Sequence, residues 1–285
     1  MLIAHFSDMH VTVDGEFAFE EVDTAGALER CIQHVNALDP APDVVVITGD
    51  LTFNGDIQEY ATLRAHLSIL DAPYFLIPGN HDRRDRLRAA FADLAYLPIK
   101  SEFIHYVVDD YPLRLIALDT VHPGRVGGLL CEDRLEWLEH KLSINNDKPT
   151  IILMHHPPFK TGIEYMDRTG LANASSFADI VSKNNQIRLI LCGHVHRPIQ
   201  TNWSGAAVLN EDTMQSEEVA LSYSEQEEIE PGLKFKTISG IMVETTGVSV
   251  HVESTDVHVH EVLITEGVGE GNKYLHNLDS AEQLD

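Results

Sequence analysis

Residues 191–198 read LCGHVHRP and place two histidines two positions apart, after a glycine and at the end of an apolar run. Imidazole is the commonest metal ligand among side chains, so His194 and His196 are candidate metal ligands. Taken alone, the segment favours the more ordinary alternative of two polar residues on a turn. The residues at the ends of the other apolar runs decide between a metal site and an ordinary turn.

Short runs rich in Val, Ile and Leu recur through the first two thirds of the chain, at residues 2–6, 44–48, 74–78, 114–119, 150–154 and 188–192. Apolar residues on both faces of such runs predict buried strands. Four intervening segments carry apolar residues at steps of three and four, which predicts helices over residues 23–38, 56–70, 132–143 and 175–185. This alternation predicts a layered α/β fold with helices flanking the sheet.

Residues that can bind a metal come directly after five of these predicted strands. Because the carboxyl ends of parallel strands meet at one edge of a sheet, we expect the residues to share a site. Carboxylate and imidazole together suit Zn, Mn or Fe(II) better than Ca or Mg. Seven such ligands are too many for one tetrahedral ion but enough for two ions that share a carboxylate. The predicted ligands are Asp8, His10, Asp50, Asn80, His155, His194 and His196.

The five motifs read SDMH (7–10), TGD (48–50), PGNHD (78–82), MHHPP (154–158) and CGHVH (192–196). Together they resemble the motifs of the calcineurin-like metallophosphoesterase superfamily. Within it, the bacterial branch of class III cyclic-nucleotide phosphodiesterases and glycerophosphodiesterases is the most similar. The resemblance spans residues 5–198 and implies an α/β fold, a four-layer αββα sandwich. The second sheet would then include residues 105–110 and part of the chain after residue 200.

The resemblance also implies roles for the predicted residues. One metal site would comprise Asp8, His10, Asp50 and His196, and the other Asp50, Asn80, His155 and His194, with Asp50 bridging. Asn80, His81 and Asp82 would form the catalytic group, in which Asn80 and His81 contact the substrate. His81 would approach the leaving oxygen, and Asp82 would orient His81, as carboxylates do for neighbouring imidazoles. His156 receives no ligand role, and two divalent ions (Mn, Fe, Zn or Co) are the implied cofactors.

The implied reaction is the hydrolysis of a small phosphodiester by a metal-bound hydroxide. A 3′,5′-cyclic nucleotide such as cyclic AMP and a glycerophosphodiester are the two candidate substrates. A phosphomonoesterase or nucleotidase on the same scaffold is one alternative, and a non-catalytic binding protein of the same fold is another. The complete ligand set and His81 argue against the second alternative. Acidic residues after the last motif, Glu211 and Asp212, would disfavour the more highly charged monoester.

The chain is strongly acidic, with 45 acidic and 20 basic residues and a formal net charge of −25. Such a charge repels nucleic-acid backbones and anionic membranes, so neither a nucleic acid polymer nor a membrane is an expected partner. Three cysteines without a CxxC spacing indicate a reducing compartment. Because no signal peptide or membrane span is apparent, we expect a cytoplasmic protein.

The last third of the chain differs in pattern from the rest. We expect residues 1–200 to form the catalytic core, and residues 201–285 to complete the second sheet and add a β-rich extension with a polar, frayed tail. Residues 240–264 alternate apolar and polar side chains, which predicts an antiparallel meander with turns near Gly247 and Asp256. This segment could pack within the chain or form the interface of a homo-oligomer, a dimer or higher.

Overall fold

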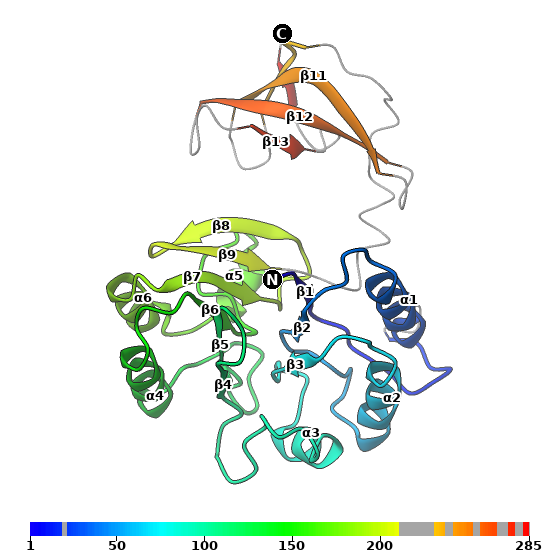
Figure 1. The fold of residues 1–285 in the computed structure, drawn as a ribbon, viewed down its shortest axis with the longest axis vertical. Helices are drawn as coiled ribbons and strands as arrows, with labels where there is room; N and C mark the ends of the chain where they lie inside the picture. The colour runs from blue at the N-terminus through cyan, green and yellow to red at the C-terminus, as the bar shows by residue number, and fades with distance from the viewer. Residues whose placement is uncertain are drawn as a thin grey trace. The chain divides into compact units, whose positions relative to one another are not determined.

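The computed structural model describes residues 1–18, 22–210, 231–236, 242–252, 257–266, 273–276 and 282–284. The chain divides into two compact units, Met1–Met214 and Gln215–Asp285 (Figure 1). All five motifs lie in the first unit, which continues past residue 200 through two further strands. In the described ranges, no helix is long and apolar enough to cross a membrane.

Two sheets form the centre of the first unit. The smaller sheet is parallel, in the order β1 (Ile3–Phe6), β2 (Val44–Ile47) and β3 (Tyr74–Leu76). The larger sheet has six strands, in the order β4-β5-β6-β7-β9-β8. Its central strands β5, β6, β7 and β9 run parallel, and both edge strands are antiparallel to their neighbours. The bounds are β4 Tyr106–Val108, β5 Arg114–Ala117, β6 Thr150–Leu153, β7 Ile187–Cys192, β8 Ile199–Trp203 and β9 Ala206–Asn210.

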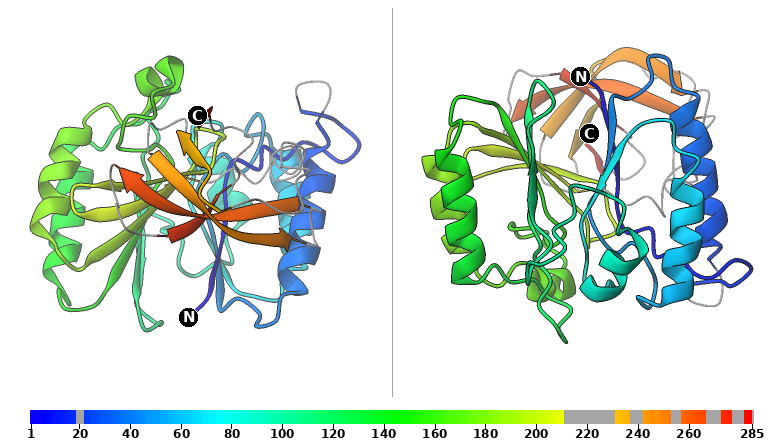
Figure 2. Two further views of the ribbon diagram at one scale, coloured as in Figure 1. Left: turned by 90° about the horizontal axis from the view of Figure 1, so that it is seen from above. Right: turned by 60° about the horizontal axis from the view of Figure 1, so that its bottom comes forward.

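Helices cover the outer face of each sheet, as Figures 1 and 2 show. Helices α1 (Thr24–Asn36), α2 (Ile57–Leu67) and α3 (Arg84–Ala90) accompany the smaller sheet, and α4 (Glu132–Ser143) and α6 (Ala174–Lys183) accompany the larger one. The short α5 (Glu164–Thr169) precedes α6. Asp23 caps α1 by accepting a hydrogen bond from the Gly26 N–H, and Asp56 with Glu59 forms a capping box at α2.

The two hydrophobic clusters confirm the four-layer αββα arrangement. Ile151 and Leu153 on β6 belong to a cluster shared with strands of the smaller sheet, whereas Ile152 between them packs with Leu138 of α4 and Phe177 of α6. Successive side chains of a strand point to opposite faces, so β6 is buried on both sides. The expected second sheet is therefore confirmed, with β4 from residues 105–110 and β8 and β9 from the segment around residue 200.

The second unit contains a five-stranded antiparallel sheet in the order β13-β12-β11-β10-β14. Its bounds are β10 Lys234–Lys236, β11 Met242–Val252, β12 Val257–Glu266, β13 Lys273–His276 and β14 Glu282–Leu284. The pairing of β11 with β12 is antiparallel, as expected. The prediction of a turn at Gly247 is wrong, because β11 continues through this residue. Its pairing with β12 is irregular between Thr245 and Ser249, and glycine is common at such bulges. Part of the tail that we expected to be frayed forms β14, and the expected turn at Asp256 lies outside the described residues.

His105 gives the core a pH-dependent element. It is buried just before β4 and stacks on Trp137 of α4 with ring centroids 4.4 Å apart. Its Nδ1 is one of the buried side-chain atoms without a hydrogen bond among the described residues. Burial lowers the pKa of His105 to about 4, from the 6.5 of a histidine in water. The folded state therefore binds fewer protons than the unfolded state, and stability is lost as the pH falls from 6.5 towards 4.

The substitution His105→Phe should reduce this loss, because phenylalanine keeps the aromatic packing and cannot titrate. We expect the drop in the free energy of unfolding between pH 7 and pH 5 to be about 1–2 kcal/mol smaller in the variant. Urea denaturation of the metal-free protein at both pH values measures it. His140→Gln is the control, because the side chain of His140 is exposed on α4. An unchanged pH dependence in His105→Phe would contradict the assignment.

Candidate metal centre

The predicted ligands lie at the carboxyl ends of strands from both sheets. Asp8 and His10 follow β1, Asp50 follows β2 and Asn80 follows β3, whereas the three remaining histidines follow β6 and β7. The expectation of a single sheet edge therefore needs a correction, since two sheets contribute to the site. The two edges are joined by the His194 N–H, which donates to the Asp8 carboxylate at 2.9 Å.

One group of side chains contains Asp8, His10, Asp50 and His196. Their ligand atoms all lie within 4.8 Å of one another. The Nε2 atoms of His10 and His196 are 3.1 Å apart, and His196 Nε2 is 3.6 Å from Asp8 Oδ1. This is the first of the two ligand sets expected from the sequence.

The second set is centred on the amide of Asn80. Its Oδ1 lies 3.2 Å from His155 Nε2 and 3.0 Å from His194 Nδ1. Asp50 Oδ2 is 3.3 Å from His155 Nε2 and 3.7 Å from His10 Nε2, so this carboxylate lies between the two sets. The structure thus brings all seven predicted ligands together.

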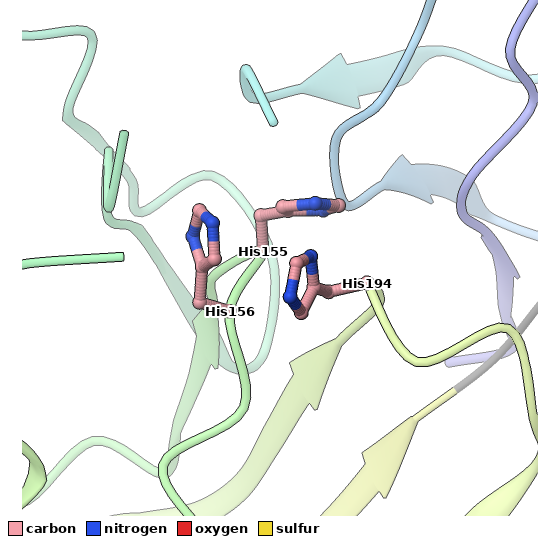
Figure 3. A group of neighbouring side chains, drawn as sticks. All are labelled: His155, His156 and His194. Carbon is pink, nitrogen blue, oxygen red and sulfur yellow. The ribbon is translucent and has the colours of Figure 1, made fainter. Parts of the chain in front are cut away.

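His156 is close to His155 and His194 (Figure 3), but it is engaged elsewhere. Its Nδ1 lies 2.7 Å from Thr120 Oγ1 and its Nε2 lies 2.8 Å from the Val126 carbonyl oxygen. Both ring nitrogens therefore have protein partners. His156 therefore fixes the loop after β5 against the site.

The backbone at the site adopts an unusual conformation. Among the described residues, seven non-glycine residues have positive φ, and five of them are predicted ligands: Asp8, His10, Asp50, His194 and His196. Left-handed backbone is disfavoured for residues with a Cβ and concentrates at functional sites. The fold therefore sustains local strain in order to direct these side chains into one space.

The charges of the site fit divalent cations. Burial opposes ionisation of Asp50, but the positive charge of His155 and its hydrogen bond hold the pKa of Asp50 well below the usual range. Burial likewise opposes protonation of His155, yet Asp50 raises its pKa to about 9. Burial lowers the pKa of His10 and of His194 to about 3, which leaves neutral rings with a lone pair for a metal. Buried carboxylates beside the neutral rings of His10 and His194 are a donor set for Mn, Fe, Zn or Co, and a bound cation would displace the proton of His155.

Asp82 contacts different groups from those we expected. Its carboxylate accepts hydrogen bonds from the Leu51, Thr52 and Gly79 N–H groups and from two hydroxyls, those of Thr52 and Tyr60. Burial raises its pKa to about 6. Asp82 therefore holds together the loops that carry Asp50 and Asn80.

His81 receives its orientation from a backbone carbonyl instead. Its Nδ1 lies 2.6 Å from the Phe53 carbonyl oxygen, so Nδ1–H donates to that oxygen. The other ring nitrogen, Nε2, is not used in this contact. The His81 N–H also donates to Asp50 Oδ1 at 2.9 Å, and its ring lies edge-on to His10 with centroids 4.6 Å apart. The Phe53 carbonyl, and not Asp82 as we expected, therefore orients the His81 ring.

Gly193 makes the close approach of the last motif to the first one possible. A Cβ at this position would lie 1.8 Å from Ser7 Oγ and 2.4 Å from Asp8 Oδ2. We expect Gly193→Ala to lower the free energy of unfolding by about 1–3 kcal/mol, as overpacking does, and to displace Asp8. Thermal unfolding with and without Mn²⁺ measures both effects. Gly170→Ala is the matched control, because its Cβ would meet its nearest neighbour at an ordinary 3.4 Å; equal behaviour of the two variants would contradict the prediction.

A pocket of about 750 Å³ opens beside Asn80 and His81. Its walls include residues 80–85, which run from the loop after β3 into the start of α3, and the loop at residues 121–126 after β5. It is also lined by Arg83, Arg84, His122 and Arg125, which were not predicted from the sequence. The pair of arginines directly after the PGNHD motif was the one available signal. Glu211 and Asp212, which we expected to make the site acidic, lie outside the described residues.

Comparison with known proteins adds independent findings. The sequence model of the family described as calcineurin-like phosphoesterase matches residues 1–198. Over 210 residues the chain is 39% identical to a probable glycerophosphodiester phosphodiesterase, GpdQ, of Arcobacter nitrofigilis, which covers 73% of this chain and 77% of that protein. It is 29% identical to the 3′,5′-cyclic adenosine monophosphate phosphodiesterase CpdA of Pseudomonas aeruginosa, over 69% and 70% of the two chains. A dimetal phosphatase from Danio rerio, 16% identical, shares the fold with a TM-score of 0.59 over 74% of this chain and 87% of that one.

Proposed function

This chain belongs to the calcineurin-like phosphoesterase family, and we propose that it hydrolyses small phosphodiesters at a centre of two divalent cations. The position of the Asp50 carboxylate between two sets of ligands carries the proposal. Asp8, His10 and His196 would complete one site, and Asn80, His155 and His194 the other. The donor set admits Mn, Fe, Zn or Co.

The bound cations would supply a nucleophile at neutral pH and offset the charge that develops on the phosphate. The remaining functions belong to the side chains around them. Asn80 contacts the phosphate from the rim of the pocket. In the imidazolium form of His81, Nδ1–H is held by the Phe53 carbonyl and Nε2–H would donate its proton to the leaving oxygen, which leaves the neutral ring. Asp82 acts on catalysis indirectly, through the loops that it joins.

Two substrate classes are supported by the named relatives, the glycerophosphodiesters and the 3′,5′-cyclic nucleotides. Both are small diesters whose phosphate carries one negative charge. A pocket of about 750 Å³ has the size of a site for a small molecule. The net charge of −25 argues against a nucleic acid polymer as substrate. The three cysteines form no disulfide, which supports our proposal of a cytoplasmic location.

The direct experiment measures hydrolysis of cyclic AMP and of glycerophosphoethanolamine side by side after reconstitution with Mn²⁺. Asn80→Ala serves as the blank, because it removes the amide oxygen that lies beside the ring nitrogens of His155 and His194. Selective turnover of cyclic AMP would assign the enzyme to nucleotide hydrolysis, and preference for the glycerol diester would assign it to the other class. If both metals bind and neither compound is hydrolysed, the proposed substrate class is wrong.

A further inference from the structure

The guanidinium groups of two arginines in the pocket beside the candidate metal centre have no partner in the described part of the chain. Arg83 and Arg125 both line the pocket, and both side chains are exposed. Neither guanidinium has a hydrogen bond or an ion pair with any described residue. Unpaired cations in the pocket of a chain with such an excess of acidic residues call for an anionic ligand.

The other charges that line the pocket do not neutralise this pair. Arg84 is paired with the buried Asp119 through two hydrogen bonds. Asp82 is buried, and its carboxylate already accepts hydrogen bonds from groups that include the Leu51 N–H and the Tyr60 hydroxyl. Asp85 is the one exposed carboxylate of the lining, so two unpaired cations face a single acid.

The scissile phosphate does not account for both cations. Asn80 and His81, at the rim, contact the reacting phosphate in the proposed function, and the bound metals would neutralise it. The pocket of about 750 Å³ is far larger than a phosphate group, and Arg83 and Arg125 lie on different loops. Arg83 follows β3 of the smaller sheet, and Arg125 follows β5 of the larger one.

We propose that Arg83 and Arg125 form a subsite for a second anionic group, so that the enzyme favours phosphodiesters with a carboxylate or phosphate on one ester substituent. This inference rests on the proposed function, whose substrate class it narrows. Guanidinium groups bind both anions in planar geometry, and an exposed pair of them favours the charged ligand about tenfold.

Glycerophosphoserine and glycerophosphoethanolamine test the subsite, because they differ by one carboxylate. Each is measured as a competitor of bis(4-nitrophenyl) phosphate hydrolysis by the Mn²⁺-reconstituted protein, which gives an inhibition constant whether or not the competitor is itself hydrolysed. We expect the serine diester to bind about tenfold more tightly at low salt, and this preference to shrink as ionic strength rises. In Arg83→Gln/Arg125→Gln the two constants should become nearly equal.

Arg188→Gln is a control for the loss of a single arginine charge, because Arg188 is exposed near the start of β7 and does not line the pocket. It should keep the preference for the serine diester. Equal inhibition constants in the wild type, or a preference that survives in the double variant, would overturn the subsite. An equal weakening of both competitors by the double variant would place the arginines at the scissile phosphate and would also overturn it. Absence of metal-dependent hydrolysis of bis(4-nitrophenyl) phosphate would instead contradict the proposed function, and the subsite with it.

Discussion

Replacing Asp50 with asparagine is expected to lower kcat by about 10³-fold or more and to remove bound metal from the purified protein. The Asp50 carboxylate lies between His10 and His155, with Oδ2 within 3.7 Å of both Nε2 atoms. Asparagine keeps the size of the side chain and one oxygen for the His81 N–H, but it removes the buried negative charge. A group that holds two cations contributes several kcal/mol to the reaction, which corresponds to this loss in rate.

The measurement combines metal content by mass spectrometry with kcat for bis(4-nitrophenyl) phosphate. Asp133→Asn, an exposed position in the first turn of α4, controls for the loss of one charge and should change neither quantity. A further readout does not depend on activity. Because Asp50 is the main group that raises the pKa of His155 to about 9, the His155 ring of the metal-free variant should titrate at lower pH by NMR. An Asp50→Asn protein with two metals and normal turnover would disprove the bridging role.

The positions of the candidate metal ligands could be predicted because they depend on a simple rule of topology. Parallel strands deliver the residues after their carboxyl ends to one edge, and the apolar runs before Asp50 and His155 are fully buried strands, β2 and β6. The division of these strands between two sheets was available only from the family resemblance. Each run is buried on both faces, so its pattern does not reveal which strand lies beside it.

Contacts to the backbone and positions in loops could not be predicted in the same way. The partner of His81 is the carbonyl of Phe53, and every residue has such a carbonyl, so no side-chain pattern marks it. Arg125 reaches the pocket because β5 lies beside β6 in the larger sheet, and the loop around it has no motif. The left-handed backbone of His10 and His196 also has no sequence signal, since glycine or asparagine is the usual residue there.

His81→Ala is expected to lower kcat about 10²- to 10⁴-fold for an alkyl diester such as glycerophosphoethanolamine, with metal content unchanged. His81 has no predicted ligand role, and its ring is held by the Phe53 carbonyl rather than by a ligand side chain. In the imidazolium form of His81, Nε2–H can therefore donate a proton to a departing alkoxide at the rim of the pocket, while Nδ1–H stays on the Phe53 carbonyl. Without that proton, the alkoxide is a poor leaving group and the P–O bond breaks slowly.

The size of the loss should depend on the leaving group, and this dependence separates proton donation from simple positioning. Nitrophenolate is stable as an anion, so bis(4-nitrophenyl) phosphate needs little help from an acid and should lose much less activity in His81→Ala. A positioning role predicts equal losses for both substrates. Asp82→Asn supplies the comparison, because Asp82 joins the Asp50 and Asn80 loops and does not contact the His81 ring. It should reduce the turnover of both substrates by a similar factor, and the same uniform loss in His81→Ala would rule out His81 as the proton donor.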